Sequence, residues 1–169
     1  MRLLPIVVTT VGLAAAAPAF AADLSVSVDI PRLNTASYHR PYVAIWIERP
    51  DQSAVRTLAV WYQLILNNEG DGKDWLKDMR TWWRKGGRAM TLPADGVSGA
   101  TRAPGTQTIR VPGARLNGLQ PGQYNIVVEA ARELGGREVV RVPFRWGAAN
   151  SGQASGSTEL GAVRVNVTR

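Results

Sequence analysis

The sequence predicts a mainly β protein, a sandwich of two sheets into which one short amphipathic helix and one long loop are inserted. About seven or eight short segments have strand patterns, and turn-forming residues separate them at a regular spacing. One segment, Lys73–Lys85, has a helical period instead. A run of strands interrupted once by a helix is typical of a β-sandwich rather than of an alternating α/β fold.

The first half of the chain predicts three strands and the helix. Leu24–Ile30 alternates apolar and polar residues, which is the pattern of a strand with one buried face. Tyr42–Arg49 and Ser53–Gln63 are separated by the turn-forming sequence PDQ, so we expect them to pair as a hairpin. In Lys73–Lys85 the apolar residues recur at helical spacing, and Gly86-Gly87 ends the predicted helix.

The second half predicts four more strands. They are Thr106–Val111, Tyr124–Arg132, Arg137–Trp146 and Leu160–Thr168. Gly135-Gly136 predicts a hairpin turn, and AANSGQASGST before the last strand predicts a flexible loop. The sequence LQPGQY, which ends at Tyr124, has the L-x-P-G-x-Y form found at corners of immunoglobulin-like and fibronectin-like sheets, where the Tyr hydroxyl returns to nearby backbone. We therefore expect an immunoglobulin/fibronectin-like β-sandwich.

The N-terminus has the pattern of a secretory signal peptide. Arg2 precedes the apolar run Leu3–Ala17, and Ala19-Phe20-Ala21 forms a cleavage site. The run is shorter than the roughly 20 apolar residues that a transmembrane helix needs. We predict a signal peptide over residues 1–21, cleavage after Ala21, a single domain over residues 22–169 and a periplasmic location; a retained membrane anchor is the alternative.

Composition excludes several functions. The chain has no cysteine, which excludes disulfides, thiolate metal sites and cysteine-linked haem. Its formal charge of +7 is spread along the sequence. We interpret this charge as solvated surface and expect no nucleic acid partner, with attraction to acidic partners or membrane headgroups as the alternative.

Residues 95–101, DGVSGAT, form the most specific motif. The pattern D-x-x-[ST]-G-A-[ST] resembles the attachment motif that periplasmic flavin transferases of the ApbE type recognise, and Asp95, Ser98, Gly99, Ala100 and Thr101 occupy its defined positions. The resemblance implies FMN joined by a phosphoester to the hydroxyl of Thr101. Asp95 is assigned to recognition by the transferase or to the shape of the turn. The alternative is a plain Asp-Gly turn.

Several neighbours of the motif are candidate cofactor contacts. Gly99 and Ala100 are small and would leave the hydroxyl accessible on an exposed loop. Arg102 could offset phosphate charge, as could the basic residues Arg84, Lys85 and Arg88. Trp82 and Trp83, with Trp75, either belong to the core or lie against the flavin ring.

Longer segments, among them HRPYVAIWIE, VRTLAVW and PGQYNIVVEAARELGG, are similar to a family of small periplasmic proteins of unknown function, DUF2271. The association of that family with flavin transferases and PepSY-type membrane proteins implies an extracytosolic electron-transfer system, with reduction of ferric iron or siderophore complexes as a candidate activity. The family pattern has a His where this chain has Leu134, so any role of that His is absent here.

The remaining polar candidates are less specific. His39 is the single histidine, and it either packs at a strand entry or handles protons near a flavin. Glu129, Glu133 and Glu138 are predicted to be solvated strand carboxylates. Because no motif of an enzyme is present, we expect a redox carrier more than an enzyme with its own substrate; the alternative is a cofactor-free, immunoglobulin-like binding module.

Overall fold

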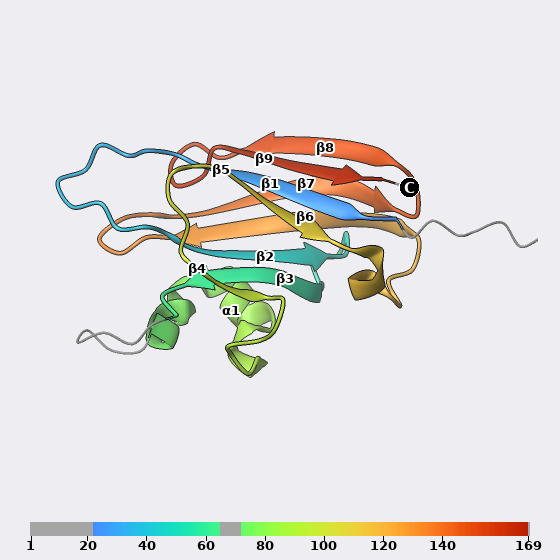
Figure 1. Cartoon of the computed structure of the whole chain (residues 1–169), viewed down its shortest axis with the longest axis horizontal. Coiled ribbons are helices and arrows are strands. Elements are labelled where there is room, and N and C mark those ends of the chain that lie inside the picture. The colour runs from blue at the N-terminus through green and yellow to red at the C-terminus, as the bar shows by residue number, and fades with distance from the viewer. Residues whose placement is uncertain (1–21, 65–71, 169) are drawn as a thin grey trace, which may run out of the picture.

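The computed structural model describes residues 22–64 and 72–168. The predicted signal peptide and its cleavage site lie outside the described residues. The described chain forms two β-sheets that pack face to face, and short helices cover the outer face of one of them (Figure 1). The predicted mainly β architecture is thereby confirmed. None of the described helices is long and apolar enough to span a membrane.

The two sheets differ in size and order. The four-stranded sheet has the order β5 (Gly105–Val111), β1 (Leu24–Ile30), β9 (Ala162–Val167) and β8 (Asn150–Ser155). The five-stranded sheet has the order β4 (Ser98–Ala100), β3 (Ala54–Tyr62), β2 (Tyr42–Glu48), β6 (Gly122–Ala131) and β7 (Arg137–Trp146). Neighbouring strands are antiparallel except β3 and β4, which are parallel.

The helical segments are short. They are the 3₁₀ helices η1 (Gly72–Asp78), η2 (Gly87–Ala89) and η3 (Gly113–Leu116) and the α-helix α1 (Arg80–Lys85). The prediction of one continuous helix over Lys73–Lys85 is therefore wrong. In a 3₁₀ helix residues three apart share a face, so Trp75 and Asp78 lie together on η1, and Trp75 is 52% exposed while Leu76 is buried.

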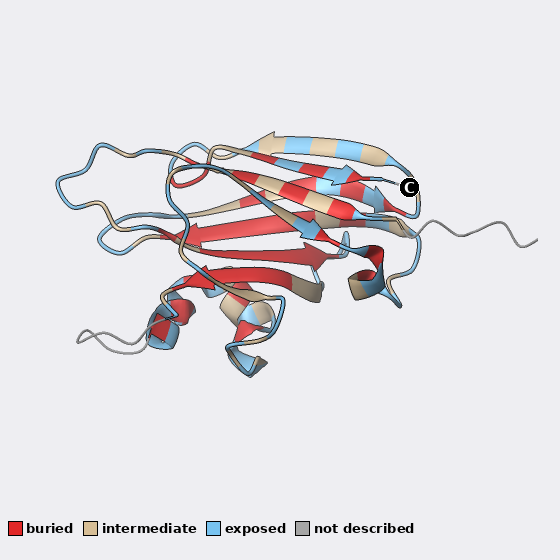
Figure 2. Ribbon diagram, viewed as in Figure 1, coloured by how far each residue is buried: buried red, intermediate tan, exposed pale blue. Residues whose placement is uncertain are grey.

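The main core lies between the sheets. Many of its side chains come from alternate strand positions, as Val43, Ile45 and Ile47 of β2 illustrate. Tyr124 closes one edge of this core, and its hydroxyl donates to the carbonyl oxygen of Gln120 at 2.9 Å, which confirms the predicted corner contact. Figure 2 shows β2, β3 and β6 buried along most of their length.

A second core lies on the outer face of the five-stranded sheet, under η1 and α1. Trp46 of β2, Val127 of β6 and Trp82 of α1 belong to it. The indole Nε1 of Trp82 donates to Thr57 Oγ1 at 3.0 Å. Gly87 packs so closely on the Trp82 ring that a Cβ there would lie 2.6 Å from it. These contacts make Trp82 a core residue.

Two glutamates are completely buried on this outer face. Glu129 accepts hydrogen bonds from the backbone N–H groups of Thr81 (3.1 Å) and Trp82 (2.7 Å) and from Arg137 (2.6 Å). The prediction that Glu129 is a solvated surface carboxylate is wrong, because the helical insertion covers this strand. Glu48 accepts from Lys85 (2.6 Å) and Arg141 (3.2 Å). Glu129 on β6 binds the first turn of α1, and Glu48 on β2 binds Lys85 at the end of α1. Both carboxylates therefore attach α1 to the sheet.

Two segments predicted as loops contain strands. β8 lies within AANSGQASGST and pairs with β9, and its residues alternate in exposure along this edge (Figure 2). β4 lies within the LPADGVSGAT segment and pairs with the end of β3. Both are edge strands whose small residues have little β-propensity, so the hydrogen bonds of a neighbouring strand decide their structure.

Candidate functional site

A cavity of about 770 Å³ lies at one end of the five-stranded sheet. At this end β3, β4 and β6 finish and β2 and β7 begin, on the left in Figure 1. Five separate segments line it, with the residues Tyr38, His39, Arg40, Tyr42, Gln63, Trp75, Asp78, Thr101, Ala131, Arg132, Glu133 and Leu134. We call it the Thr101 cavity.

The DGVSGAT segment brings Thr101 to this cavity. The backbone N–H of Ser98 donates to the carbonyl of Ala94 at 2.9 Å, and the Ser98 hydroxyl accepts from the Ala94 N–H at 3.0 Å. Gly96 has a φ of 68° in this turn, a conformation that favours glycine. The three residues of β4 then run beside β3, with Ala100 opposite Tyr62. The next residue, Thr101, is half-buried in the cavity wall.

Gly99 and Arg102 flank Thr101 through their contacts with Trp61. A Cβ at Gly99 would lie 3.2 Å from Cδ1 of the Trp61 indole, so the strand approaches the ring closely. The guanidinium carbon of Arg102 lies 5.2 Å from the ring centroid, a cation–π distance. Asp95 is exposed and does not line the cavity. The motif therefore divides into an exposed part, a turn-forming part and the threonine itself.

The tryptophan that lines the cavity is Trp75. Trp82 is 2% exposed within the outer core, and Trp83 is half-buried against that core at 6.3 Å between ring centroids from Trp82. Neither Trp82 nor Trp83 lines the cavity. The sequence prediction placed Trp75, Trp82 and Trp83 on one α-helix. In the structure Trp75 and Asp78 lie three residues apart in the 3₁₀ helix η1, so both face the cavity.

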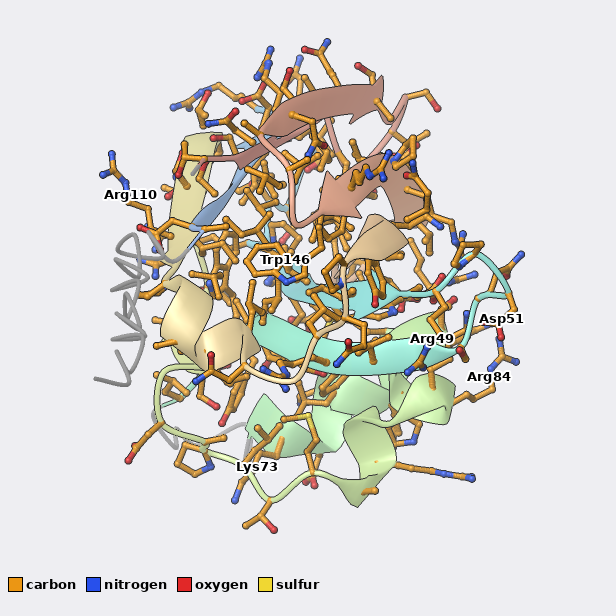
Figure 3. All side chains as sticks on the ribbon, turned by 90° about the vertical axis from the view of Figure 1, so that its right-hand side faces the viewer. Arg49, Asp51, Lys73, Arg84, Arg110 and Trp146 are labelled. Carbon is orange, nitrogen blue, oxygen red and sulfur yellow. The ribbon has the colours of Figure 1, made fainter. Side chains whose placement is uncertain are left out.

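The basic residues after Trp83 do not line the cavity either. Lys85 donates to Glu48 at 2.6 Å and to the carbonyl of Gln52 in the β2–β3 turn at 2.6 Å. Figure 3 is viewed from the end opposite the cavity and shows Arg84 on the same side as Arg49 and Asp51 of that turn. Arg84, Lys85 and Arg88 therefore lie outside the cavity wall, and their role in offsetting a phosphate at Thr101 stays a prediction.

His39 does line the cavity. Its Nδ1 lies 3.3 Å from Oε2 of Glu133, and its Nε2 lies 3.0 Å from the hydroxyl of Ser37. The side chains of His39 and Glu133 are 38% and 68% exposed. The imidazole thus has polar partners for both nitrogens and lies in the wall of the Thr101 cavity.

Arg132 and Tyr38 are cavity residues that sequence reasoning missed. The Arg132 side chain is 6% exposed and binds Glu159 with two hydrogen bonds, from Nε at 2.9 Å and from Nη2 at 3.1 Å. Hydrogen bonding to Glu159, opposed by burial, raises the pKa of Arg132. Nη1 of Arg132 and the hydroxyl of Tyr38 are buried and without a hydrogen-bond partner. The sequence feature that could have indicated Arg132 is its place shortly before the Gly135-Gly136 turn, and this pattern is too common to identify a site residue.

A metal site finds no support in residues 22–64 and 72–168, because no group of three or more His, Asp or Glu side chains is close enough together to hold an ion. The site is a cavity lined by aromatic side chains and by charged side chains of both signs, with the arginines Arg40 and Arg132 and the carboxylates Asp78 and Glu133, beside one half-buried hydroxyl. Its volume falls in the range of about 300–1,000 Å³ typical of small-molecule sites.

The two sheets, the covering helices and the Thr101 cavity define a mainly β domain with a preformed, ligand-sized site at one end. The chain belongs to the family described as predicted periplasmic protein (DUF2271), whose model matches residues 23–162. The resemblance stated from the sequence is thereby confirmed, whereas the flavin attachment motif stays a prediction. No curated protein and no solved structure matches the chain.

Proposed function

We propose that this protein carries FMN on Thr101 and acts in extracytosolic electron transfer. The observation that carries the proposal is the position of Thr101. The final residue of the D-x-x-S-G-A-T motif is half-buried in the wall of a cavity of about 770 Å³ that it shares with aromatic and basic side chains. A plain turn would need no cavity behind its last residue.

The residues of the cavity fit an FMN group. Trp75 and Tyr42 offer planar apolar surfaces, and Arg40 and His39 offer polar or positive ones. The cavity residues also include buried polar atoms without partners, which a polar ligand would satisfy. Bound FMN would supply the electron-transfer chemistry, while the protein supplies attachment, orientation and shielding.

The attachment chemistry uses the Thr101 hydroxyl. Its oxygen would bond to the flavin phosphate of a flavin dinucleotide donor as the phosphoanhydride bond of the donor breaks, the nucleoside monophosphate leaves and the hydroxyl proton is released, so the chain gains FMN less one water. The β3–β4 pairing and the Ser98–Ala94 hydrogen bonds hold this residue in place. Asp95 is exposed on the preceding turn, where the transferase could recognise it.

The partners in this proposal are an ApbE-type flavin transferase, which loads the protein, and a PepSY-type membrane protein as electron donor. The acceptor class is ferric iron or a siderophore complex. Signal-peptide cleavage after Ala21 would release the carrier into the periplasm, the location in the family's description. The charge of +7 would favour acidic partners.

A cofactor-free binding module is the second candidate, and one observation favours it. Trp75 and Leu134 line the cavity and are 52% and 82% exposed. Large exposed apolar side chains that lie together are typical of surfaces that bind a partner, and such a role needs no flavin. The two candidates differ in whether the purified protein is yellow.

Intact mass spectrometry tests the proposal. The full chain is expressed with its signal peptide beside a periplasmic flavin transferase, and the peptide containing residues 95–102 is mapped. We expect a mass increase equal to FMN less one water on Thr101, none in Thr101→Ala, and retention in Thr101→Ser, which keeps a hydroxyl. An unmodified chain, with the transferase active on a control substrate, would leave the binding module as the better account.

We also infer that the sandwich is immunoglobulin-like. The order β4-β3-β2-β6-β7 corresponds to the C″-C′-C-F-G sheet of variable-type immunoglobulin domains, and Tyr124 supplies a tyrosine corner at the start of the strand in the F position. β4 departs from that pattern because it runs parallel to β3.

A further inference from the structure

The Arg132 side chain is held in the Thr101 cavity by a charge pair that leaves part of it unused. Glu159 is 5% exposed and accepts from two of the three guanidinium nitrogens, and it also accepts from the backbone N–H of Gly136 at 2.8 Å. The third nitrogen, Nη1, has no partner. A buried donor without an acceptor carries a desolvation penalty that native proteins avoid.

The turn after β6 is shaped around this pair. A Cβ at Gly135 would overlap the guanidinium of Arg132, and a Cβ at Gly136 would lie 2.8 Å from Glu159 Oε1. The two glycines therefore leave room for the pair of Arg132 and Glu159. Leu134, with a φ of 52°, adopts a backbone conformation that is unfavourable for its side chain. Such construction fixes the position of the unused N–H groups.

Tyr38 supplies a second unused polar atom in the same cavity. Within the described ranges, its hydroxyl and Nη1 of Arg132 are the two buried side-chain nitrogen or oxygen atoms without a hydrogen-bond partner. They come from segments far apart in the sequence, the β1–β2 connection and the β6–β7 turn. Both residues line the Thr101 cavity. Two unsatisfied atoms in one cavity are what a missing polar ligand would leave.

The chemistry of the pair selects a class of ligand group. Because Glu159 neutralises the charge of Arg132, the free N–H groups suit an uncharged carbonyl more than a second anion. The Tyr38 hydroxyl can both donate and accept. The isoalloxazine ring has an edge with two carbonyls and one N–H, and its opposite edge is apolar. Trp75 and Tyr42 of the same cavity offer aromatic surface to a planar ring.

We propose that Nη1 of Arg132 and the hydroxyl of Tyr38 form a hydrogen-bonding wall that binds the carbonyl-bearing edge of the flavin ring. This inference rests on the proposed function and extends it from the attachment point to the ring. Thr101 holds the phosphate end, and the wall holds the ring end. Both atoms are buried, so the ring edge would reach them by displacing the side chains that cover them, and the site would recognise flavin without the phosphate.

The test is riboflavin binding to the full chain with Thr101→Ala. Riboflavin lacks the phosphate, and the variant lacks the acceptor hydroxyl, so the measurement reports on the ring site alone. We expect saturable quenching of riboflavin fluorescence. Tyr38→Phe and Arg132→Lys, each added to Thr101→Ala, should raise the dissociation constant about tenfold, the effect of one lost hydrogen bond. The matched control is Tyr124→Phe, which removes a hydroxyl outside the cavity and should leave the dissociation constant unchanged.

Tyr38→Phe keeps the test decisive even if Arg132→Lys fails to fold, because it removes an atom that has no partner. The proposed ring site would be refuted if Thr101→Ala showed no saturable binding of riboflavin. It would also be refuted if the Tyr38→Phe variant bound riboflavin as tightly as its parent. A mass addition on Thr101 together with either result would leave the proposed function standing. Conversely, binding that is lost in Tyr38→Phe, without any mass addition, would support the ring site and reject covalent attachment.

Discussion

The two faces of the five-stranded sheet are buried by different means. The inner face packs on the other sheet through apolar side chains such as Ile45, Ile126 and Val142. The outer face is covered by η1 and α1, and its core contains the completely buried carboxylates of Glu48 and Glu129. The inner face needs no directional partner, whereas each outer carboxylate needs several donors placed around it.

This difference shows how a short insertion can be attached to a sheet. Helix α1 has only six residues, too few to be stable alone in water. Glu129 accepts from the N–H groups of Thr81 and Trp82 in its first turn, where helical N–H groups lack partners inside the helix. The sheet thereby stabilises the helix and holds the preceding segment η1, which brings Trp75 to the Thr101 cavity.

The largest expected effect is that of Glu129→Ala. The substitution leaves the N–H groups of Thr81 and Trp82 without their buried acceptor, while Arg137, whose side chain is 38% exposed, can turn to water. We expect the free energy of unfolding to fall by about 3–5 kcal/mol, mainly from the two unsatisfied N–H groups. Urea denaturation measures this. Glu133→Ala, on the same hairpin but with a side chain that is 68% exposed, is the control and should change stability by less than about 0.5 kcal/mol. Equal effects of the two variants would contradict the distinction between the faces.

On the inner face, Ile45→Ala should cost about 3 kcal/mol, through lost transfer free energy and the cavity left behind. The side chain is 0% exposed in the main core. Unlike Glu129→Ala, this change should leave α1 attached to the sheet. Native-state hydrogen exchange of the Thr81 and Trp82 amides measures that attachment. Selective loss of protection at these amides in Ile45→Ala would show that the two faces are not independent.

The contribution of Glu138 to the stability of the protein is expected to depend on pH. Burial would raise its pKa, but the backbone N–H groups of Ser157, Leu160 and Thr158 outweigh burial and lower the pKa from 4.5 to about 2. The folded carboxylate therefore binds its proton more weakly than the unfolded one. Its stabilisation is present above pH 4.5 and is lost as the pH falls towards 2.

Glu138→Gln tests this expectation. At pH 7 the variant should be less stable by about 2 kcal/mol, the value of hydrogen bonds to a charged group. The difference between wild type and variant should shrink as the pH falls from 4.5 towards 2, measured by urea denaturation at each pH. A difference that is constant over this interval would mean that the loop N–H groups do not stabilise the charged form.

The smallest effect is expected for Tyr124→Phe. The ring remains in the inner core, and the hydrogen bond to the Gln120 carbonyl at 2.9 Å is lost. The cost should be about 1 kcal/mol in thermal or urea unfolding. A cost as large as that of Ile45→Ala would show that the corner, rather than apolar packing, dominates this face.

The strands with strong patterns could be located from the sequence. β1 and β7 have the predicted bounds, because alternating or β-branched residues sit between clear turn signals. β8 was missed because the hydrogen bonds of β9, not its own Gly- and Ser-rich residues, make it a strand. The helical character of Lys73–Lys85 was predicted, but the type of helix was not. The same apolar residues fit either one α-helix or a 3₁₀ helix followed by α1.

The candidate site likewise contains one residue that the sequence indicates and others that it does not. Thr101 was identified from the sequence because its motif is a contiguous, local pattern. Its neighbours Tyr38, Trp75 and Arg132 lie on segments that are distant in the chain and meet where the strands end. Their convergence depends on strand order and on the register of pairing, and no local pattern encodes either.

The amino-acid sequence was therefore sufficient for the β class, the family, most strand positions and the choice of Thr101 as a candidate residue. The burial of Glu129, the exposure of Trp75 and the unused N–H groups of Arg132 came from packing. The physical reason is that local backbone preferences and periodicity act between neighbours in the chain, whereas burial and the satisfaction of polar groups depend on which distant segments meet.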